Sequence, residues 1–216
     1  MNPEFSGWRE GLMFYGPVIV AGLVLGVALR PWGYWWAGVP VVLLGVAMML
    51  FFRDLPRTIA AEANELVSPA DGTVVAIEDL EETPHYEGPC RRVSIFMSVF
   101  SAHVNRAPFE STVKDVRYLP GAYKDARRPD SSKINESNAL WLDTPRGPVT
   151  VRQISGAVAR RIVCPVKPGT ALKKGEKFGM IRFGSRVELY LPPGTEVAAA
   201  MNQYVYAGTT ILARFP

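Results

Sequence analysis

Three short stretches of this 216-residue sequence carry side chains that could do chemistry. Ser185 follows Gly184 between two strand-like stretches, and a Gly-Ser pair by itself usually marks an ordinary turn. His103 could give and take a proton because the unperturbed pKa of histidine lies near neutrality, although a lone histidine in a strand-rich domain is more often a packed residue. Asp71 precedes Gly72, and Asp-Gly is a common turn between strands. Taken singly, none of the three indicates a function.

Longer segments around these residues are more informative because they occur together and in order. They read SPADG at 68–72, AHVNRAP at 102–108, NESN at 135–138 and KGEKFGMIRFGSRVELYLP at 174–192. Over about residues 60–216 this set resembles the short phosphatidylserine decarboxylase family, and two apolar runs ahead of it also fit that family. Several separated motifs in register are far more specific than any one of them.

The resemblance implies a proenzyme that cuts itself between Gly184 and Ser185. A serine hydroxyl on a strained turn can attack the preceding carbonyl and turn the peptide into an ester. Loss of the serine α-proton then expels the carboxylate and leaves dehydroalanine, which hydrolyses to a pyruvoyl group and ammonia. Glycine at 184 leaves the carbonyl open to attack because it has no side chain. The products would be a β chain, 1–184, and an α chain, 185–216, held together as an αβ heterodimer.

By the same resemblance, the pyruvoyl group derived from Ser185 is the covalent cofactor. Decarboxylation leaves charge on Cα, and a ketone that forms a Schiff base with the substrate amine can delocalise that charge. The expected reaction converts phosphatidylserine of the membrane into phosphatidylethanolamine and CO2, with His103 as proton donor and acceptor. We expect no metal, since two histidines and two cysteines form no ligand spacing, and no nucleic-acid partner, since no such motif is present.

One position departs from the family's pattern. Some longer relatives carry a second histidine three positions after the first, thought to form a relay with an aspartate and the serine, and this sequence has Arg106 there. Asp71 matches the relay aspartate. Without the second histidine, Asp71 could orient His103 or pair with Arg106. Cationic candidates for contacts to the substrate's phosphodiester are Arg106, Arg127, Arg128 and Lys133.

Two uncharged apolar runs precede these motifs, at 12–29 and 31–52. At about 1.5 Å per residue they would span roughly 27 and 33 Å, close to the ~30 Å of a hydrocarbon core. Aromatic residues gather in the turn between the runs, as they do at a membrane interface. Arginines at 9, 53 and 57 weakly favour both ends in the cytoplasm.

We therefore expect residues 1–57 to form a transmembrane helical hairpin that holds the catalytic domain at the cytoplasmic side of the cell membrane. The alternatives are a buried soluble helix pair and a pair that lies in the membrane interface. A cleaved signal peptide fits poorly, because the second run follows at once without an A-x-A-like site. The net charge of +4 suits an anionic bilayer surface.

Residues 58–216 are typical of one β-rich domain. Strand-like stretches recur between Gly and Pro turns at 72–77, 92–96, 149–154, 186–191 and 210–212. Thr58–Leu66 is the best helix candidate, and the composition of 119–138 predicts a long loop. Two units that each begin with Pro-Gly-Thr, at 168–170 and 193–195, resemble the swapped strands of a lipoyl or biotinyl carrier. The expected fold is therefore mainly β, of the barrel-sandwich type.

Two other functions compete with the leading one. An archaetidylserine decarboxylase would act on the same headgroup, and the sequence does not separate the two. A carrier module or a membrane-tethered scaffold without catalysis belongs to a different class, and the Met-Lys-Met or Asp-Lys-Ala setting of a carrier's lysine does not occur in this sequence. Cys90 and Cys164 are too few for a disulfide framework, so we expect them to be reduced and structural.

Overall fold

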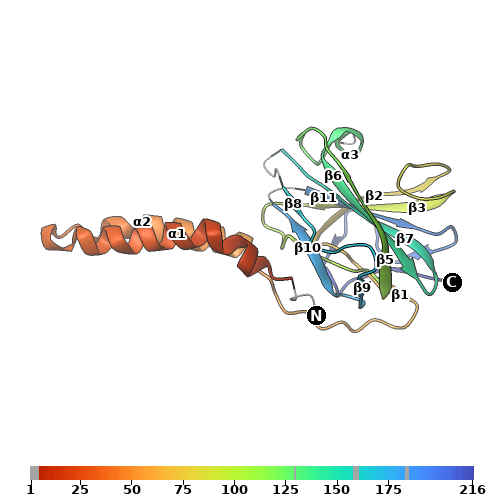
Figure 1. The fold of residues 1–216 in the computed structure, drawn as a ribbon, viewed down its shortest axis with the longest axis horizontal. Coiled ribbons are helices and arrows are strands. Elements are labelled where there is room, and N and C mark those ends of the chain that lie inside the picture. Colours follow the sequence, from red (N-terminus) through yellow and green to blue (C-terminus); the bar gives the residue numbers. More distant parts are fainter. Residues whose placement is uncertain (1–4, 129, 158–160, 183–184) are drawn as a thin grey trace. The chain divides into compact units, whose positions relative to one another are not determined.

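The computed structural model describes residues 5–128, 130–157, 161–182 and 185–216. The chain divides into two compact units: Ser6–Leu55, and a larger unit that contains Pro56–Pro216. Figure 1 shows the first as a pair of helices and the second as a domain of curled strands. The mainly β fold expected for the second unit is confirmed in this general form.

The first unit contains two apolar helices, α1 (Gly7–Ala28) and α2 (Gly38–Phe51), with two 3₁₀ turns between them, η1 (Arg30–Trp32) and η2 (Trp35–Ala37). The 22 residues of α1 correspond to about 33 Å. With a mean hydropathy of 2.0 over its most apolar window, α1 is long and apolar enough to cross a membrane. The 14 residues of α2 correspond to only about 21 Å. The second apolar run becomes an α-helix late because Pro31 lies within η1 and Gly33 takes a left-handed φ of +79°.

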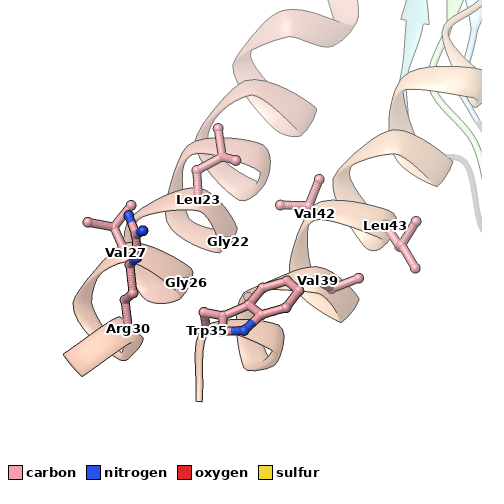
Figure 2. Close-up of a pocket in the computed structure, with 10 residues that line it drawn as sticks. Gly22, Leu23, Gly26, Val27, Arg30, Trp35, Val39, Val42 and Leu43 are labelled. Atoms are coloured by element: carbon pink, nitrogen blue, oxygen red, sulfur yellow. The ribbon is translucent and has the colours of Figure 1, made fainter. Parts of the chain in front are cut away.

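Glycines allow the two helix backbones to approach each other closely. A side-chain carbon placed on Gly22 would lie 2.7 Å from the backbone nitrogen of Val42, so a larger residue there would push the helices apart. Towards the turn the helices leave an open pocket of about 600 Å³, shown in Figure 2, whose lining is apolar apart from Arg30 and the backbone. No described residue in this lining could serve as nucleophile or general base.

The second unit contains fourteen described strands that pair antiparallel with one another. They are β1 (Glu65–Val67), β2 (Gly72–Leu80), β3 (Cys90–Met97), β4 (Val104–Arg106), β5 (Ser111–Leu119), β6 (Ser137–Thr144), β7 (Gly147–Ile154), β8 (Ile162–Val163), β9 (Ala171–Leu172), β10 (Lys177–Ile181), β11 (Ser185–Leu191), β12 (Glu196–Val197), β13 (Tyr204–Val205) and β14 (Ile211–Arg214). Eight of them form one curled sheet in the order β13-β2-β3-β11-β7-β6-β5-β9, and the others form the sheets β1-β14-β12 and β4-β10-β8.

Strand β11 lies in the interior of the large sheet, between β3 and β7. Because side chains alternate along a strand, Val187 and Leu189 enter the hydrophobic core, whereas Arg186 and Glu188 point to the opposite face. That opposite face is also buried. The segment between β5 and β6, which carries the short helix α3 (Ser131–Ile134), contributes contacts to it.

The strands predicted at 72–77, 92–96, 149–154, 186–191 and 210–212 are confirmed as β2, β3, β7, β11 and β14. The long loop predicted at 119–138 is also confirmed, apart from α3 and the strand ends. The helix predicted at Thr58–Leu66 is wrong. This stretch has no regular secondary structure up to a turn at 63–64 and then enters β1, where Leu66 pairs with Ala213 and is fully buried. A nine-residue helix is marginal by itself, and burial of Leu66 in a sheet outweighs its propensity.

Candidate active site

Ser185 is the first residue of β11 and has no exposed surface. Its backbone pairs with Met97 on β3, and its Oγ lies 3.4 Å from the sulfur of Met97. Gly184, the other half of the expected cleavage site, lies outside the described residues. The hydroxyl of Ser185 is therefore shielded from bulk water at the end of an interior strand, in the residue that follows position 184.

His103 directly precedes β4 and is also fully buried. Its carbonyl oxygen accepts a hydrogen bond of 3.3 Å from the backbone N–H of Ile181, the last residue of β10. The pairing of β4 with β10 therefore places the backbone of His103 beside Ile181, which lies four positions ahead of Ser185 in the sequence. The structure thus brings together two regions that are about eighty residues apart in the sequence.

Asp71 lies in the turn that precedes β2, and its side chain is buried. Its Oδ1 accepts the backbone N–H of Ala207 at 2.7 Å, and its Oδ2 forms an ion pair with Arg57 at 2.8 Å. The same turn is tied to β4, because the backbone N–H of Arg106 donates to the carbonyl of Pro69 at 3.0 Å. Arg57 is thus a cationic partner of Asp71 that the sequence did not suggest; the sequence suggested Arg106 or an interaction with His103.

A chain of buried amides, which the sequence analysis did not single out, reaches the surroundings of Ser185. Asn138 donates to Gln153 at 3.3 Å, Gln153 donates to Asn105 at 2.8 Å, and Asn105 Nδ2 lies 3.9 Å from the sulfur of Met97. Met97 therefore contacts both Asn105 and Ser185. Polar residues such as Gln153 inside an apolar strand were the available signal, because a buried amide requires a fixed partner.

The cationic candidates fall into two groups. Arg127 and Arg128 form ion pairs of 2.6 and 3.0 Å with Asp125 and Asp130 of their own loop, so their charges are compensated locally. Lys133, on α3, is exposed. Arg106 lines an open groove of about 560 Å³. The guanidinium of Arg106 donates a hydrogen bond to the carbonyl oxygen of Gly175 at 2.9 Å. The remaining residues of this groove are Ile59, Lys173, Lys174, Glu176 and Lys177.

A serine enclosed within a sheet is poorly placed to meet a soluble substrate while the chain continues on both sides of it. A serine in such a position could instead attack its own backbone and become a chain end, which is the behaviour of a self-processing proenzyme. The comparisons with known proteins agree with this class. Residues 44–213 match the family model for phosphatidylserine decarboxylase.

Curated relatives extend the match over nearly the whole chain. A phosphatidylserine decarboxylase proenzyme of Nitrosomonas europaea is 44% identical over 209 residues, which cover 96% of this chain and 94% of that protein. Proenzymes of the same name from Nitrosomonas eutropha and Carboxydothermus hydrogenoformans are 42% identical over 208 residues and 41% identical over 217, covering 96% and 99% of this chain and 94% and 99% of those proteins. The chain belongs to the phosphatidylserine decarboxylase family. The family, its carboxy-lyase class and its dependence on a pyruvoyl group, expected from the sequence, are thereby confirmed.

Proposed function

We propose that this chain cuts itself between Gly184 and Ser185 and then decarboxylates phosphatidylserine to phosphatidylethanolamine and CO2. The observation that carries the proposal is the position of Ser185, fully buried at the first residue of interior strand β11. A serine at a strand's beginning becomes a chain terminus held by a sheet once the preceding bond is broken. The membership of the family supports both the cleavage and the substrate.

The proposed cleavage uses residues of this chain only, together with water. The Oγ of Ser185 attacks the carbonyl carbon of residue 184, and the amide becomes an ester with a free amine at 185. Removal of the α-proton of residue 185 expels the carboxylate of residue 184. The dehydroalanine that remains takes up water and releases ammonia, which leaves a ketone at the start of the α chain. His103 is the proposed proton carrier for these steps.

In the mature enzyme the pyruvoyl group supplies an electron sink for the charge left on the substrate's Cα. The pyruvoyl group replaces Ser185 itself, so the place that the sheet gives to Ser185 is already the place of the cofactor. We assign proton transfer at the substrate's Cα to His103. We assign to Asp71 the task of fixing the turn at 68–72 through its bonds to Arg57 and Ala207, while the backbone hydrogen bond from Arg106 to Pro69 joins that turn to β4.

We further propose that residues 1–57 anchor the enzyme and that residues 58–216 form the catalytic domain. The length and hydropathy of α1 support a helix that spans the cell membrane, and arginines at 9, 53 and 57 support a catalytic domain on the cytoplasmic side. The shorter α2 packs against α1 through glycines, so the two helices would enter the bilayer together.

A barrel-sandwich relation of the catalytic domain is supported by its two Pro-Gly-Thr turns. Gly169 and Gly194 have nearly the same left-handed φ, +86° and +83°. The glycines of the following turns, Gly175 and Gly208, also match, at +76° and +75°. A side-chain carbon placed on Gly175 or on Gly208 would contact Ile59, so two similar turns approach the same residue.

The groove around Arg106 is the proposed contact for the substrate's phosphate. Three lysines, Lys173, Lys174 and Lys177, line it together with a single carboxylate, Glu176, which leaves an excess of positive charge. The other residue that lines the groove is Ile59, three positions after Pro56, where the main part of the larger unit begins. Cationic side chains are suitable partners for a phosphodiester, and a headgroup could enter an open groove while its acyl chains stay in the bilayer.

Intact-mass analysis of the full chain, purified in detergent, tests this function. We expect a fragment that begins at residue 185 with a pyruvoyl mass, and CO2 release from phosphatidylserine vesicles. Ser185→Ala should give one chain of 23.8 kDa without activity. An uncut wild-type chain that is fully active would refute the proposal, and an uncut inactive chain would favour a carrier or scaffold. Parallel assays on archaetidylserine distinguish the two lipid backbones.

A further inference from the structure

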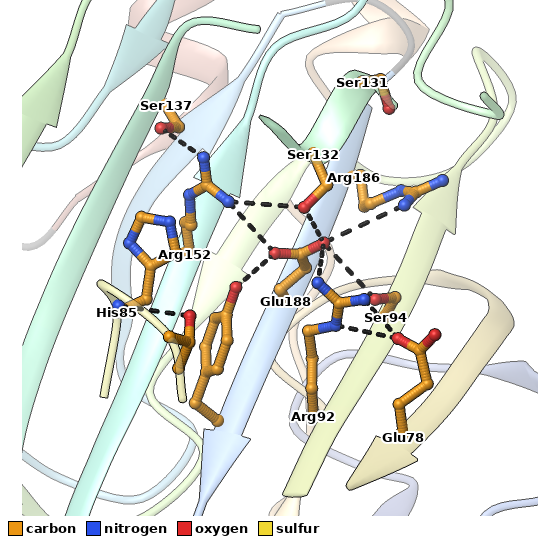
Figure 3. Close-up of polar contacts among 12 residues, drawn as sticks. Glu78, His85, Arg92, Ser94, Ser131, Ser132, Ser137, Arg152, Arg186 and Glu188 are labelled. Atoms are coloured by element: carbon orange, nitrogen blue, oxygen red, sulfur yellow. Dashed lines mark hydrogen bonds and ion pairs between the residues drawn. The ribbon is translucent and has the colours of Figure 1, made fainter. Parts of the chain in front are cut away.

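A cluster of buried charges lies on the face of the large sheet opposite the side chain of Ser185. At its centre is Glu188, which has no exposed surface. Its carboxylate accepts a hydrogen bond from Tyr190 at 2.6 Å. It also accepts one from Ser132 at 2.7 Å, which Figure 3 shows. The guanidinium groups around it are those of Arg152 at 3.4 Å, Arg92 at 3.7 Å and Arg186 at 3.9 Å. We call these six residues the Glu188 cluster.

The members of the Glu188 cluster come from opposite sides of the proposed cleavage site. Arg186, Glu188 and Tyr190 belong to β11, whereas Arg92 lies on β3 and Arg152 on β7, the two neighbours of β11. The remaining member, Ser132, lies on α3. Arg186 also donates to the carbonyl oxygens of residues 127 and 128 at 3.4 and 3.5 Å. After cleavage every one of these contacts, except those within β11, would join the α chain to the β chain.

Most of the α chain needs no such help to stay bound. Its strand β11 pairs with β3 over residues 185–191 and with β7 over residues 186–190. Strands β13 and β14 of the same fragment pair with β2 and β1. The first residue is held less well, because Ser185 pairs with Met97 on one side and the pairing with β7 begins only at Arg186. Chain ends at the margin of a sheet open more readily than strand interiors.

The side chains of the Glu188 cluster compensate for this weakness. Arg186 is the residue next to the new terminus, and Glu188 is two residues further along the same face. Both are buried and both are bonded to the β chain, so neither can move without breaking contacts that water does not readily replace. Three guanidinium groups surround one carboxylate, so the loss of that carboxylate would also leave like charges facing one another.

We infer that the Glu188 cluster fixes the position of residue 185 once the chain is cut, and that Glu188, Arg186, Arg152 and Ser132 are positioning residues for decarboxylation. The inference rests on the proposed function, since it concerns the cofactor that Ser185 becomes. The cluster acts from behind the strand: the side chains of Arg186 and Glu188 lie on the face opposite the Ser185 side chain, and their contacts determine where the start of β11 lies. Before cleavage, we infer that the covalent bond to residue 184 fixes the position of residue 185.

The test is Glu188→Gln in the full chain, compared with Glu65→Gln as a matched control. Glu65 is a largely buried glutamate whose partner is Arg214 at 3.0 Å, so that pair also joins the β chain to the α chain, but at the far end of the fragment. For Glu188→Gln we expect complete cleavage and full pyruvoyl content by mass. We expect kcat to fall by about 10- to 100-fold, the size of effect that a small misplacement of a reacting group produces, with KM little changed. Glu65→Gln should keep its kcat.

Hydrogen exchange separates positioning from a general loss of stability. In Glu188→Gln we expect the amides of residues 186–188 to exchange about tenfold faster in the cleaved enzyme. The same substitution in the uncut Ser185→Ala chain should leave them protected. Equal exchange in the two backgrounds, or an unchanged kcat, would overturn the inference. If Glu188→Gln does not fold, Tyr190→Phe, which removes one hydrogen bond from the carboxylate, replaces it under the same criteria.

Failure of this inference and failure of the proposed function give different results. If the wild-type chain is never cut, the proposed function fails and no variant needs to be compared. If the wild type is cut and active, and Glu188→Gln is cut with normal kcat and normal exchange, only the positioning role is refuted. Loss of cleavage itself in Glu188→Gln would also refute it, because the cluster is inferred to act after the bond is broken.

Discussion

The pair formed by Arg57 and Asp71 offers a direct test of what the aspartate does. Its side chains are 15% and 5% exposed, and the two charged atoms are 2.8 Å apart. Removing one partner of a buried pair typically costs about 3–5 kcal/mol, and the partial exposure of Arg57 reduces this to roughly 2–3 kcal/mol. Asp71→Asn retains an oxygen for the N–H of Ala207, so that hydrogen bond should survive.

If the aspartate serves mainly to hold its turn, Arg57→Gln should have the same consequences as Asp71→Asn. Both variants should lower the free energy of unfolding of the full chain in detergent by about 2–3 kcal/mol. At a slope of ~2 kcal/mol per M, this lowers the urea midpoint by about 1–1.5 M. The double variant should be less unstable than the sum, with a coupling of about 1–3 kcal/mol. Both single variants should slow cleavage to a similar extent, because the turn is bonded to β4, which follows His103.

The stability measurement is urea unfolding of four chains that all carry Ser185→Ala: the parent, Arg57→Gln, Asp71→Asn and the double variant. The rate of fragment formation is measured in the corresponding chains that retain Ser185. Suppose Arg57→Gln cuts itself at the wild-type rate while Asp71→Asn does not cut at all. Asp71 would then act directly on the chemistry of residue 185, and the view that it serves through Arg57 and the turn would be refuted.

Three further outcomes are expected. His103→Gln should slow fragment formation or turnover by at least 100-fold, and normal rates for both on gels and in the CO2 assay would remove its role. Burial, with a contribution from Arg152, lowers the pKa of His85 to about 4, so stability should fall as the pH drops from about 6.5 towards 4, by at most about 3 kcal/mol; the urea midpoint of His85→Gln should lack this dependence. Burial also raises the pKa of the Cys164 thiol to about 11, so in the folded chain it should react with iodoacetamide far more slowly than a free cysteine does at pH 8, and alkylation at a free-thiol rate would contradict this.

Local patterns predicted the strands well because their information is contained within a few residues. The alternation in 186–191 predicts a strand, and the structure confirms it as β11. The pattern does not indicate that both faces of the strand are buried. Glu188 is fully buried, and one of its hydrogen-bond partners is Ser132, which lies 56 residues away in the sequence. Contacts of this kind depend on how distant segments pack, so the pattern of residues along one strand does not predict them.

The roles of the basic residues were also ambiguous, because an arginine can contact lipid or substrate or form an ion pair within the protein. The sequence treats Arg57 as one of the basic residues that flank a membrane span, whereas in the structure it binds Asp71. Arg127 and Arg128 looked like ligands for a phosphodiester, yet neighbouring aspartates compensate their charges. The resemblance of motifs identified the segments around Ser185, His103 and Asp71. It could not identify their partners, because a partner is a property of the folded chain.

The place of β11 in the sheet has a further consequence for the life of the enzyme. The proposed α chain has 32 residues, and its strand β11 fills an interior place in the large sheet, so this fragment cannot be exchanged while that sheet remains intact. Once the mature protein has been melted, that short piece would diffuse away and meet a collapsed larger one. Heating should therefore inactivate the processed form for good, whereas the uncut precursor, whose pieces remain tethered, should recover on cooling. Maturation would thus exchange the ability to refold for the ability to catalyse.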